Sequence, residues 1–302
     1  MTTTDPAATF DPHRRRLLGL AYRMLGSMAE AEDAVQDAYL RWHAADRASI
    51  AEPRAFLMTT TTRLCLDVLK SARITREAYV GPWLPEPVAD TQSLAPDAQT
   101  ELAEDLSVAL LLALERLSPL ERAAFLLHDV FDYSFSDIAS ALERSEAACR
   151  QLATRARTHV RESRPRGVVP NTERDDGRHT ELLSAFMQAS RSGDMDTLMR
   201  LLSSDARLVA DGGGKVTSAL NVIEGAKRVA AFMSGVVRKG WNDRFEVRPA
   251  RLNGLPGLLL FGPDGLVQTT AFEFDGDVIR AIYVVRNPDK LERLGVQLRS
   301  RT

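Results

Sequence analysis

The chain has 302 residues, of which 44% are hydrophobic and 26% are charged, and its formal net charge is −2. These values are typical of a soluble globular protein with two or three domains. No apolar run approaches a membrane span, and the N-terminal segment lacks the apolar core of a signal peptide, so we expect a cytoplasmic protein. Cys65 and Cys149 fall in separate helical patterns, which predicts buried thiols without a disulfide framework. The five histidines match no metal-ligand spacing, so we expect no metal or cofactor.

Residues 10–76 carry a helical pattern throughout. Ser27 and Glu30 form a capping-box sequence, which predicts a helix start. In that helix Val35, Ala38, Tyr39 and Trp42 recur at helical spacing and should face the core. The polar residues off this stripe are Glu32, Asp33, Gln36 and Asp37. Periodicity alone leaves two interpretations open: a solvated acidic face, or a docking surface.

The next predicted helix, AFLMTTTTRLCLDVLKSARITRE, has an apolar stripe opposite a basic one. Arg63, Lys70 and Arg73 cluster on the basic side. Such a face is either an ordinary solvated surface or one that follows a nucleic-acid backbone. The helix by itself does not decide between them.

Residues 77–100 contain four prolines and little periodicity, so they should connect domains. Within them, Trp83 and Leu84 are apolar anchors in a polar setting. The neighbouring prolines stiffen the segment, so little conformational entropy is lost if it docks on a surface.

Residues 101–162 return to a helical pattern and contain a predicted helix-turn-helix. FSDIASAL is its first helix, Glu143 and Arg144 make the turn, and Ser145 is an N-cap for the second helix. The turn lacks the usual glycine. Seven arginines stand against two glutamates between residues 144 and 166, which predicts a polyanionic partner. The residues expected at the DNA surface of the second helix are Glu146, Ala147, Arg150, Gln151, Thr154, Arg155, Arg157 and Arg161.

Residues 163–177 form a second polar connector, and an α+β pattern follows it. Helices are expected near 178–192, 195–203 and 224–238, and strands near 206–210, 243–252, 256–262, 265–275 and 277–286. We find no acid–base pair at a catalytic spacing in this part, so we do not expect an enzyme.

The stretch LVADGGGKVTS raises the question of a phosphate-binding loop. A P-loop needs Gly, four residues, then Gly-Lys-Ser/Thr. Val209 occupies the first glycine position and Val216 the Ser/Thr position, and no helical pattern follows directly. We therefore reject a nucleotide site, and we expect the glycines to permit positive φ and close backbone approach.

Two stretches together resemble a known family. YRMLGSMAEAEDAVQDAYLRW and LSPLERAAFLLHDVFDYSFSDIASALERSEAACRQLATRARTHVRE, with the basic helix between them, resemble extracytoplasmic-function sigma factors over residues 10–165. WLPEP (83–87), DGGGK (211–215) and NPDKL (287–291) resemble the three signature motifs of the subgroup with a fused SnoaL-like C-terminal domain.

The resemblance implies a multidomain protein: all-α region 2 (10–76), a linker (77–100), all-α region 4 (101–165) and an α+β SnoaL-like cone (178–302). It implies RNA polymerase core and promoter DNA as partners. Asp33, Gln36 and Asp37 would dock on core polymerase, the loop at 43–53 would capture a flipped −10 base, and Arg63, Lys70 and Arg73 would hold the −10 backbone. The second helix of the helix-turn-helix would read the −35 element.

The resemblance implies that the DGGGK loop and the WLPEP linker form a regulatory contact between the C-terminal domain and the sigma core, and it assigns the NPDKL residues to regulatory contacts as well. The implied residues are Trp83, Leu84, Pro85, Glu86, Pro87, Asp211, Gly212, Gly213, Gly214, Lys215, Asn287, Pro288, Asp289, Lys290 and Leu291. Other functions stay open: a helix-turn-helix regulator whose C-terminal pocket senses a small molecule, or a DNA-tethered enzyme. Residues 27–76 favour the sigma factor, because a repressor needs no polymerase-docking helix.

Overall fold

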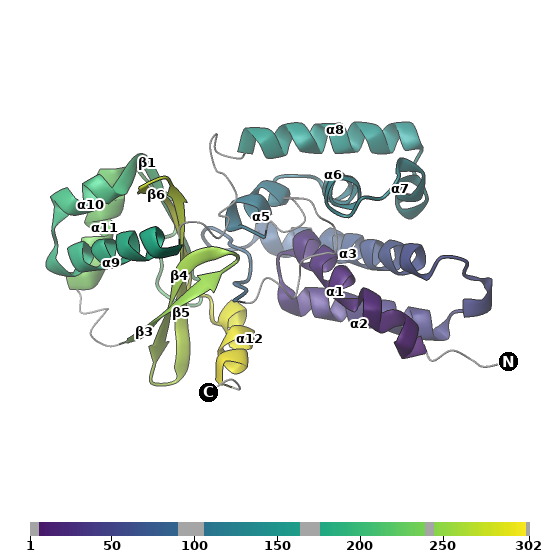
Figure 1. Cartoon of the computed structure of the whole chain (residues 1–302), viewed down its shortest axis with the longest axis horizontal. Helices are drawn as coiled ribbons and strands as arrows, with labels where there is room; N and C mark the ends of the chain where they lie inside the picture. The colour runs from purple at the N-terminus through teal and green to yellow at the C-terminus, as the bar shows by residue number, and fades with distance from the viewer. Residues whose placement is uncertain (1–5, 90–105, 164–175, 239–244, 300–302) are drawn as a thin grey trace. The chain divides into compact units, whose positions relative to one another are not determined.

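The computed structural model describes residues 6–89, 106–163, 176–238 and 245–299 (Figure 1). It divides into two compact units. The first contains Met1–Ala78 and Thr91–Pro165, and the second contains Tyr79–Asp90 and Arg166–Thr302. The described part of the first predicted linker, residues 79–89, therefore belongs to the C-terminal unit.

The first unit is helical. Its first half consists of α1 (Pro6–Leu25), α2 (Met28–Ala44), the 3-10 turn η1 (Arg47–Ser49) and α3 (Pro53–Glu77). Ser27 caps α2 by accepting a hydrogen bond from the Glu30 amide. Trp42 is buried among these helices, and its indole N–H donates to the Pro6 carbonyl at 3.1 Å. Cys65 is also buried here, as expected.

The second half of this unit holds α5 (Val108–Glu115), α6 (Pro119–Phe125), the π-helical turn η3 (Leu126–Val130), α7 (Phe135–Leu142) and α8 (Glu146–Ser163). The predicted helix-turn-helix is α7 and α8. Ser145 accepts from the Ala148 amide at 3.2 Å, which confirms its role as N-cap. Glu143 takes the place of the usual turn glycine by adopting a left-handed conformation with φ 54°.

The second unit is an α+β domain built on one six-stranded sheet of order β2-β1-β6-β5-β4-β3. Only β1 and β6 are parallel among the described strand pairs. The strands are β1 (Leu202–Asp211), β2 (Ile223–Glu224), β3 (Glu246–Leu252), β4 (Leu255–Gly262), β5 (Gly265–Asp275) and β6 (Val278–Val285). The helices are α9 (Asp176–Ser192), α10 (Met195–Leu201), α11 (Ala226–Arg238) and α12 (Pro288–Arg299).

The three helices α9, α10 and α11 lie on one side of the sheet, and α12 lies on the other (Figure 1). The core between the sheet and the first group contains Phe186, Leu208, Val229, Phe272 and Ile282. Thus the expected fold class, all-α regions followed by an α+β domain, is confirmed.

Several element boundaries differ from the sequence prediction. Leu202 and Ser203 begin β1 instead of ending the preceding helix, because β1 pairs with β6 from Leu202 onward. The short strand β2 and the final helix α12 were not predicted. Residues 239–244 lie outside the described chain, as do 90–105 and 164–175, so the predictions that fall on them are not compared.

Candidate functional site

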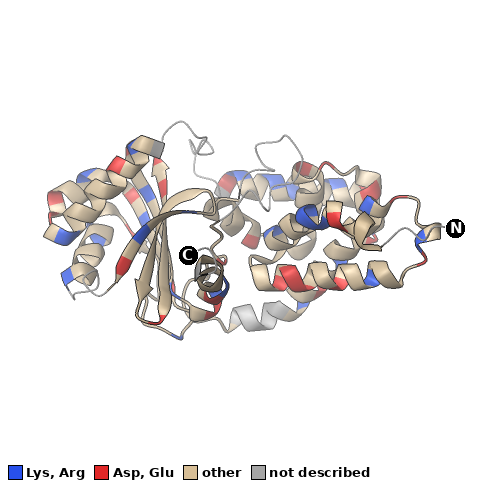
Figure 2. Cartoon of the chain, turned by 60° about the horizontal axis from the view of Figure 1, so that its bottom comes forward, with Lys and Arg blue, Asp and Glu red and all other residues tan. Residues whose placement is uncertain are grey.

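The acidic residues of α2 lie on one exposed face. Asp33, Gln36 and Asp37 are all exposed, as expected, and this face gathers negative charge (Figure 2). One turn further along the same face stands Leu40, whose exposed fraction is 55%. The sequence analysis missed Leu40, although its position off the buried stripe was visible. The face therefore combines two carboxylates with an exposed apolar side chain.

The loop after α2 contains the turn η1. Asp46 caps this turn by accepting from the Ala48 amide at 3.2 Å, and the Ser49 hydroxyl donates to the Asp46 carbonyl at 2.7 Å. The loop that the resemblance links to −10 capture thus carries its own local hydrogen bonds.

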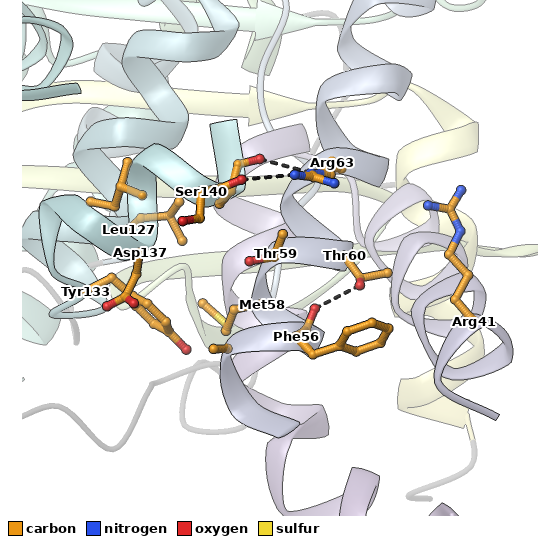
Figure 3. A pocket seen from close by; sticks show the side chains of 13 residues that line it. Arg41, Phe56, Met58, Thr59, Thr60, Arg63, Leu127, Tyr133, Asp137 and Ser140 are labelled. Atoms are coloured by element: carbon orange, nitrogen blue, oxygen red, sulfur yellow. Dashed lines mark hydrogen bonds between the residues drawn. The ribbon is translucent and has the colours of Figure 1, made fainter. Parts of the chain in front are cut away.

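Arg63 of α3 does not sit on a plain solvated face. Its Nε donates to the carbonyl of Ala141 at 3.0 Å, and its Nη2 donates to that of Ser140 at 2.9 Å (Figure 3). Its guanidinium also pairs with Glu143 at 3.1 Å. These acceptors close the C-terminal end of α7, where the helix dipole favours a cation. Helix α3 therefore contributes a cap to the first helix of the helix-turn-helix.

The other two predicted −10 residues differ from Arg63. Lys70 is exposed and pairs with Asp67 at 2.9 Å. The side chain of Arg73 lies outside the described residues. The two described residues thus differ in their contacts, and the −10 role of all three stays a prediction.

A cavity of about 320 Å³ lies beside Arg63, within the first unit (Figure 3). Phe56, Thr59 and Thr60 of α3 line one wall, and Tyr133 and Asp137 contribute to the other. The Thr60 hydroxyl donates to the Phe56 carbonyl at 2.8 Å, so it is satisfied within its own helix.

The second helix of the helix-turn-helix, α8, separates a buried stripe from an exposed one as predicted. Cys149, Ala153 and Ala156 are buried. The exposed residues include Glu146, Ala147, Arg150, Gln151, Thr154, Arg155 and Arg161. Arg157 is half-buried, and its Nε donates to Asp129 at 2.7 Å. The role of Arg157 in holding phosphate stays a prediction. In the structure Arg157 also forms an ion pair with Asp129 inside the first unit.

The three signature motifs meet in the second unit, at the side chain of Asp211. This carboxylate is fully buried. It accepts from the Leu84 amide at 2.9 Å, the Lys290 ammonium at 2.7 Å and the Gly213 amide at 3.0 Å. A fourth donor is the Tyr79 hydroxyl. We call the motifs 83–87, 211–215 and 287–291, together with Tyr79, the motif junction.

Lys290 holds the other side of the motif junction. Its ammonium also donates to the Leu84 carbonyl at 2.6 Å and lies 4.3 Å from the Trp83 ring centroid. Asn287 donates to the Tyr79 hydroxyl at 2.9 Å. Cations over aromatic faces are attracted by the ring quadrupole, so Lys290 is held by charge and by the rings together.

Tyr79 was missed by the sequence analysis because an aromatic residue after a helix has no distinctive signal. Burial, and then the hydrogen bond to Asp211, raises the pKa of Tyr79 above its ordinary value. The hydroxyl therefore stays protonated and remains a donor to the carboxylate.

The glycine run lets the backbone of the loop lie close to neighbouring side chains. Gly213 has φ 61°, and a Cβ placed there would lie 2.3 Å from Nδ2 of Asn287. The Lys215 amide donates to the Gly212 carbonyl at 3.0 Å, and the Lys215 ammonium pairs with Asp289. The lysine and this backbone are thus engaged within the domain, which supports the rejection of a phosphate cradle.

The C-terminal domain also contains a buried acid–phenol pair. The Tyr283 hydroxyl donates to Glu273 at 2.6 Å, and both side chains are buried. Burial and the nearby Glu273 carboxylate raise the pKa of Tyr283 well above its ordinary value. The sequence analysis missed the pair because its members stand on neighbouring strands, β5 and β6.

Comparison with known proteins assigns the chain to a family. A family model described as Sigma-70 region 2 matches residues 9–74, and one described as Sigma-70, region 4 matches residues 107–160. The chain is 38% identical over 290 residues to the ECF RNA polymerase sigma factor SigJ of Mycobacterium tuberculosis, covering 93% of this chain and 91% of that protein. The chain belongs to the ECF RNA polymerase sigma factors.

Other relatives agree with this assignment. The chain is 33% identical over 302 residues to a probable ECF RNA polymerase sigma factor, SigI of M. tuberculosis, with 99% of both chains covered. The crystal structure of SigJ matches with a TM-score of 0.71 and 34% identity, covering 95% of this chain and 98% of that one. As a sigma factor, the protein directs transcription initiation with RNA polymerase core and promoter DNA, and it is not an enzyme. No helix among the described residues is long and apolar enough to cross a membrane.

Proposed function

We propose that this sigma factor is regulated by its own C-terminal domain, and that the motif junction is the point of control. The observation that carries the proposal is the ion pair of the buried Asp211 and the largely buried Lys290, joined at 2.7 Å around the backbone of Leu84. A buried ion pair with further hydrogen bonds on both members fixes one geometry, because any shift leaves a charge unsatisfied.

The place of this contact in the chain gives it a regulatory role. Leu84 lies between region 2 and region 4 in sequence, and only Ala78 separates Tyr79 from the end of α3. Fastening this segment to the C-terminal domain makes that domain part of the connection between the two DNA-binding regions. A change in the domain then alters how freely the regions can separate.

We assign the surfaces that bind core polymerase and promoter DNA from the exposed faces of the first unit. Asp33, Asp37 and Leu40 on α2 would dock on core polymerase, with the two charges steering the encounter and the leucine supplying apolar contact. The loop at 43–53 and α3 would bind the −10 element, and the exposed residues of α8 would read the −35 element. These steps take place in the cytoplasm, where polymerase transcribes.

The docking surface is tested by competition for core polymerase. The double variant Asp33→Lys, Asp37→Lys should bind core about ten-fold more weakly, because it reverses the charge of the face. Asp264→Lys, an exposed turn acid in the C-terminal domain, is the matched control and should compete like the unchanged protein. Normal competition by the double variant would show that this face does not dock.

Regulation is tested by transcription in vitro with core polymerase on randomised promoter DNA. Lys290→Met should change promoter output, whereas Arg178→Met, which removes an exposed ion pair with Asp277 outside the motif junction, should not. Equal output from both variants and the unchanged protein would contradict control through the motif junction. Promoter binding that is the same with and without core would favour a helix-turn-helix regulator instead.

A further inference from the structure

Three side chains from three elements form a cluster of two rings and a guanidinium at the helix-turn-helix. The ring of His128, from η3, lies 4.1 Å from the ring of Phe135, the first residue of α7, at an interplanar angle of 32°. On α8, the guanidinium carbon of Arg150 lies 5.3 Å from the centroid of the same Phe135 ring. Phe135 thus contacts both the histidine and the arginine.

Backbone hydrogen bonds hold His128 and Phe135 in place. Nδ1 of His128 lies 2.9 Å from the carbonyl of Tyr133, two residues before Phe135. Ser134 caps α7 by accepting from the Asp137 amide at 3.2 Å, which sets where Phe135 enters the helix. The ring that Arg150 contacts is therefore held by the start of α7.

A second contact fixes an edge of the Arg150 guanidinium. Its Nη2 donates to Glu146, one turn earlier on α8, at 2.6 Å. The Arg150 side chain nevertheless keeps 55% of its surface exposed. A guanidinium has five N–H donors, so others remain for a ligand while one face and one edge are restrained. This is the geometry of a pre-organised donor at the N-terminal part of a recognition helix.

We propose that Phe135 is a positioning residue for base reading, and that Arg150, held by Phe135 and Glu146, reads a guanine. The guanidinium matches the O6 and N7 acceptors that guanine presents in the major groove. This inference rests on the proposed role of α8 in reading the −35 element. Phe135 itself need not touch DNA, because it acts through the orientation of Arg150.

The test uses holoenzyme assembled from core polymerase and the full chain. A −35 element is first selected from duplex DNA randomised at that element. Each guanine of the selected element is then replaced by 7-deazaguanine, which lacks the N7 acceptor. With the unchanged protein, one such replacement should weaken binding, and Arg150→Ala should abolish that penalty.

Phe135→Leu should reduce the same penalty and weaken binding to the selected element about two- to five-fold, as expected for loss of an exposed cation–π contact. Phe135→Tyr keeps the ring and should behave like the unchanged protein. In the Arg150→Ala background, Phe135→Leu should have no further effect.

Three results would overturn the proposal. The first is a 7-deazaguanine penalty that Phe135→Leu leaves unchanged. The second is an equal loss from Phe135→Leu with and without Arg150, since this would mean that Phe135 only packs the helices. The third is a selected element with no guanine that responds to Arg150→Ala. A holoenzyme that selects no element at all would instead refute the proposed role of α8, and the inference with it.

Discussion

Removing the Lys290 ammonium should loosen the segment at residues 79–89 from the C-terminal domain. In Lys290→Met, the buried Asp211 carboxylate loses a charged donor at 2.7 Å, and the Leu84 carbonyl loses its donor at 2.6 Å. A hydrogen bond between charged groups contributes about 1.5–3 kcal/mol, and a bond from a charged donor to a carbonyl lies near the lower end of that range. Three other donors still face Asp211, from Tyr79, Leu84 and Gly213. We therefore expect a loss of about 2–4 kcal/mol in the free energy of local opening, below the upper range for breaking a buried pair.

The assay is amide hydrogen exchange, read by mass spectrometry on peptides from residues 79–89 of the full chain. The matched control is Lys215→Met, because Lys215 also pairs with an aspartate of this domain but keeps 53% of its side chain exposed. Exposed ion pairs contribute about 0–1 kcal/mol, so this variant should retain protection. Adding Asp211→Asn to Lys290→Met should restore part of the protection, since no buried charge is then left alone. Equal protection in Lys290→Met and Lys215→Met would refute the argument that burial makes the Asp211–Lys290 pair contribute more to the free energy of local opening than the exposed Lys215–Asp289 pair.

Three further outcomes are expected. Gly213→Ala should destabilise the C-terminal domain by about 1–3 kcal/mol in urea unfolding, because a Cβ would meet Asn287 at 2.3 Å in a left-handed conformation. Glu143→Gly should stabilise the first unit by about 0.5–1 kcal/mol in thermal unfolding, since glycine adopts φ 54° without strain and the lost pair with Arg63 is exposed. The raised pKa of Tyr283 means that its stabilising effect is present below the ordinary tyrosine pKa of about 10 and is lost as pH rises above it. Tyr283→Phe should therefore lower stability at neutral pH and flatten the alkaline decline, measured by unfolding between about pH 8 and 11.

Local patterns in the sequence were sufficient to predict the helices of the first unit and the helix-turn-helix. Apolar periodicity reports which face of a helix is buried, and α8 shows this with Cys149, Ala153 and Ala156 inside. The same periodicity cannot name the partner of an exposed residue. Arg63 illustrates the limit, because its hydrogen bonds go to backbone carbonyls of α7 that leave no trace in the side-chain pattern.

In the C-terminal domain, pairing between strands that are distant in sequence decides where the strands begin and end. Strand β1 extends back to Leu202 because β6 offers it a partner, although the local pattern continued the preceding helix. Strand β2 has two residues, too few for any alternation to be seen. The sequence analysis expected a contact between DGGGK and WLPEP, but the geometry of the motif junction depends on Lys290, on Tyr79 and on the burial of Asp211, which only the folded domain creates.

The motif junction changes the length of chain that joins the two DNA-binding regions. Between α3, which ends at Glu77, and α5, which begins at Val108, an extended chain could reach about 100 Å at about 3.3–3.6 Å per residue. Once residues 79–89 are fastened around Asp211, only the stretch from residue 90 to α5 remains to span from the C-terminal domain to region 4, about 60 Å when fully extended. Within the first unit, Arg63 also ties α3 to α7 through the carbonyls of Ser140 and Ala141. Because these acceptors are backbone atoms, substitution of the Ser140 or Ala141 side chain leaves them in place. Any step that separates α3 from α7 is therefore limited by the length of chain that stays free once the motif junction has formed. This limit is the physical link that we propose between the C-terminal domain and DNA binding.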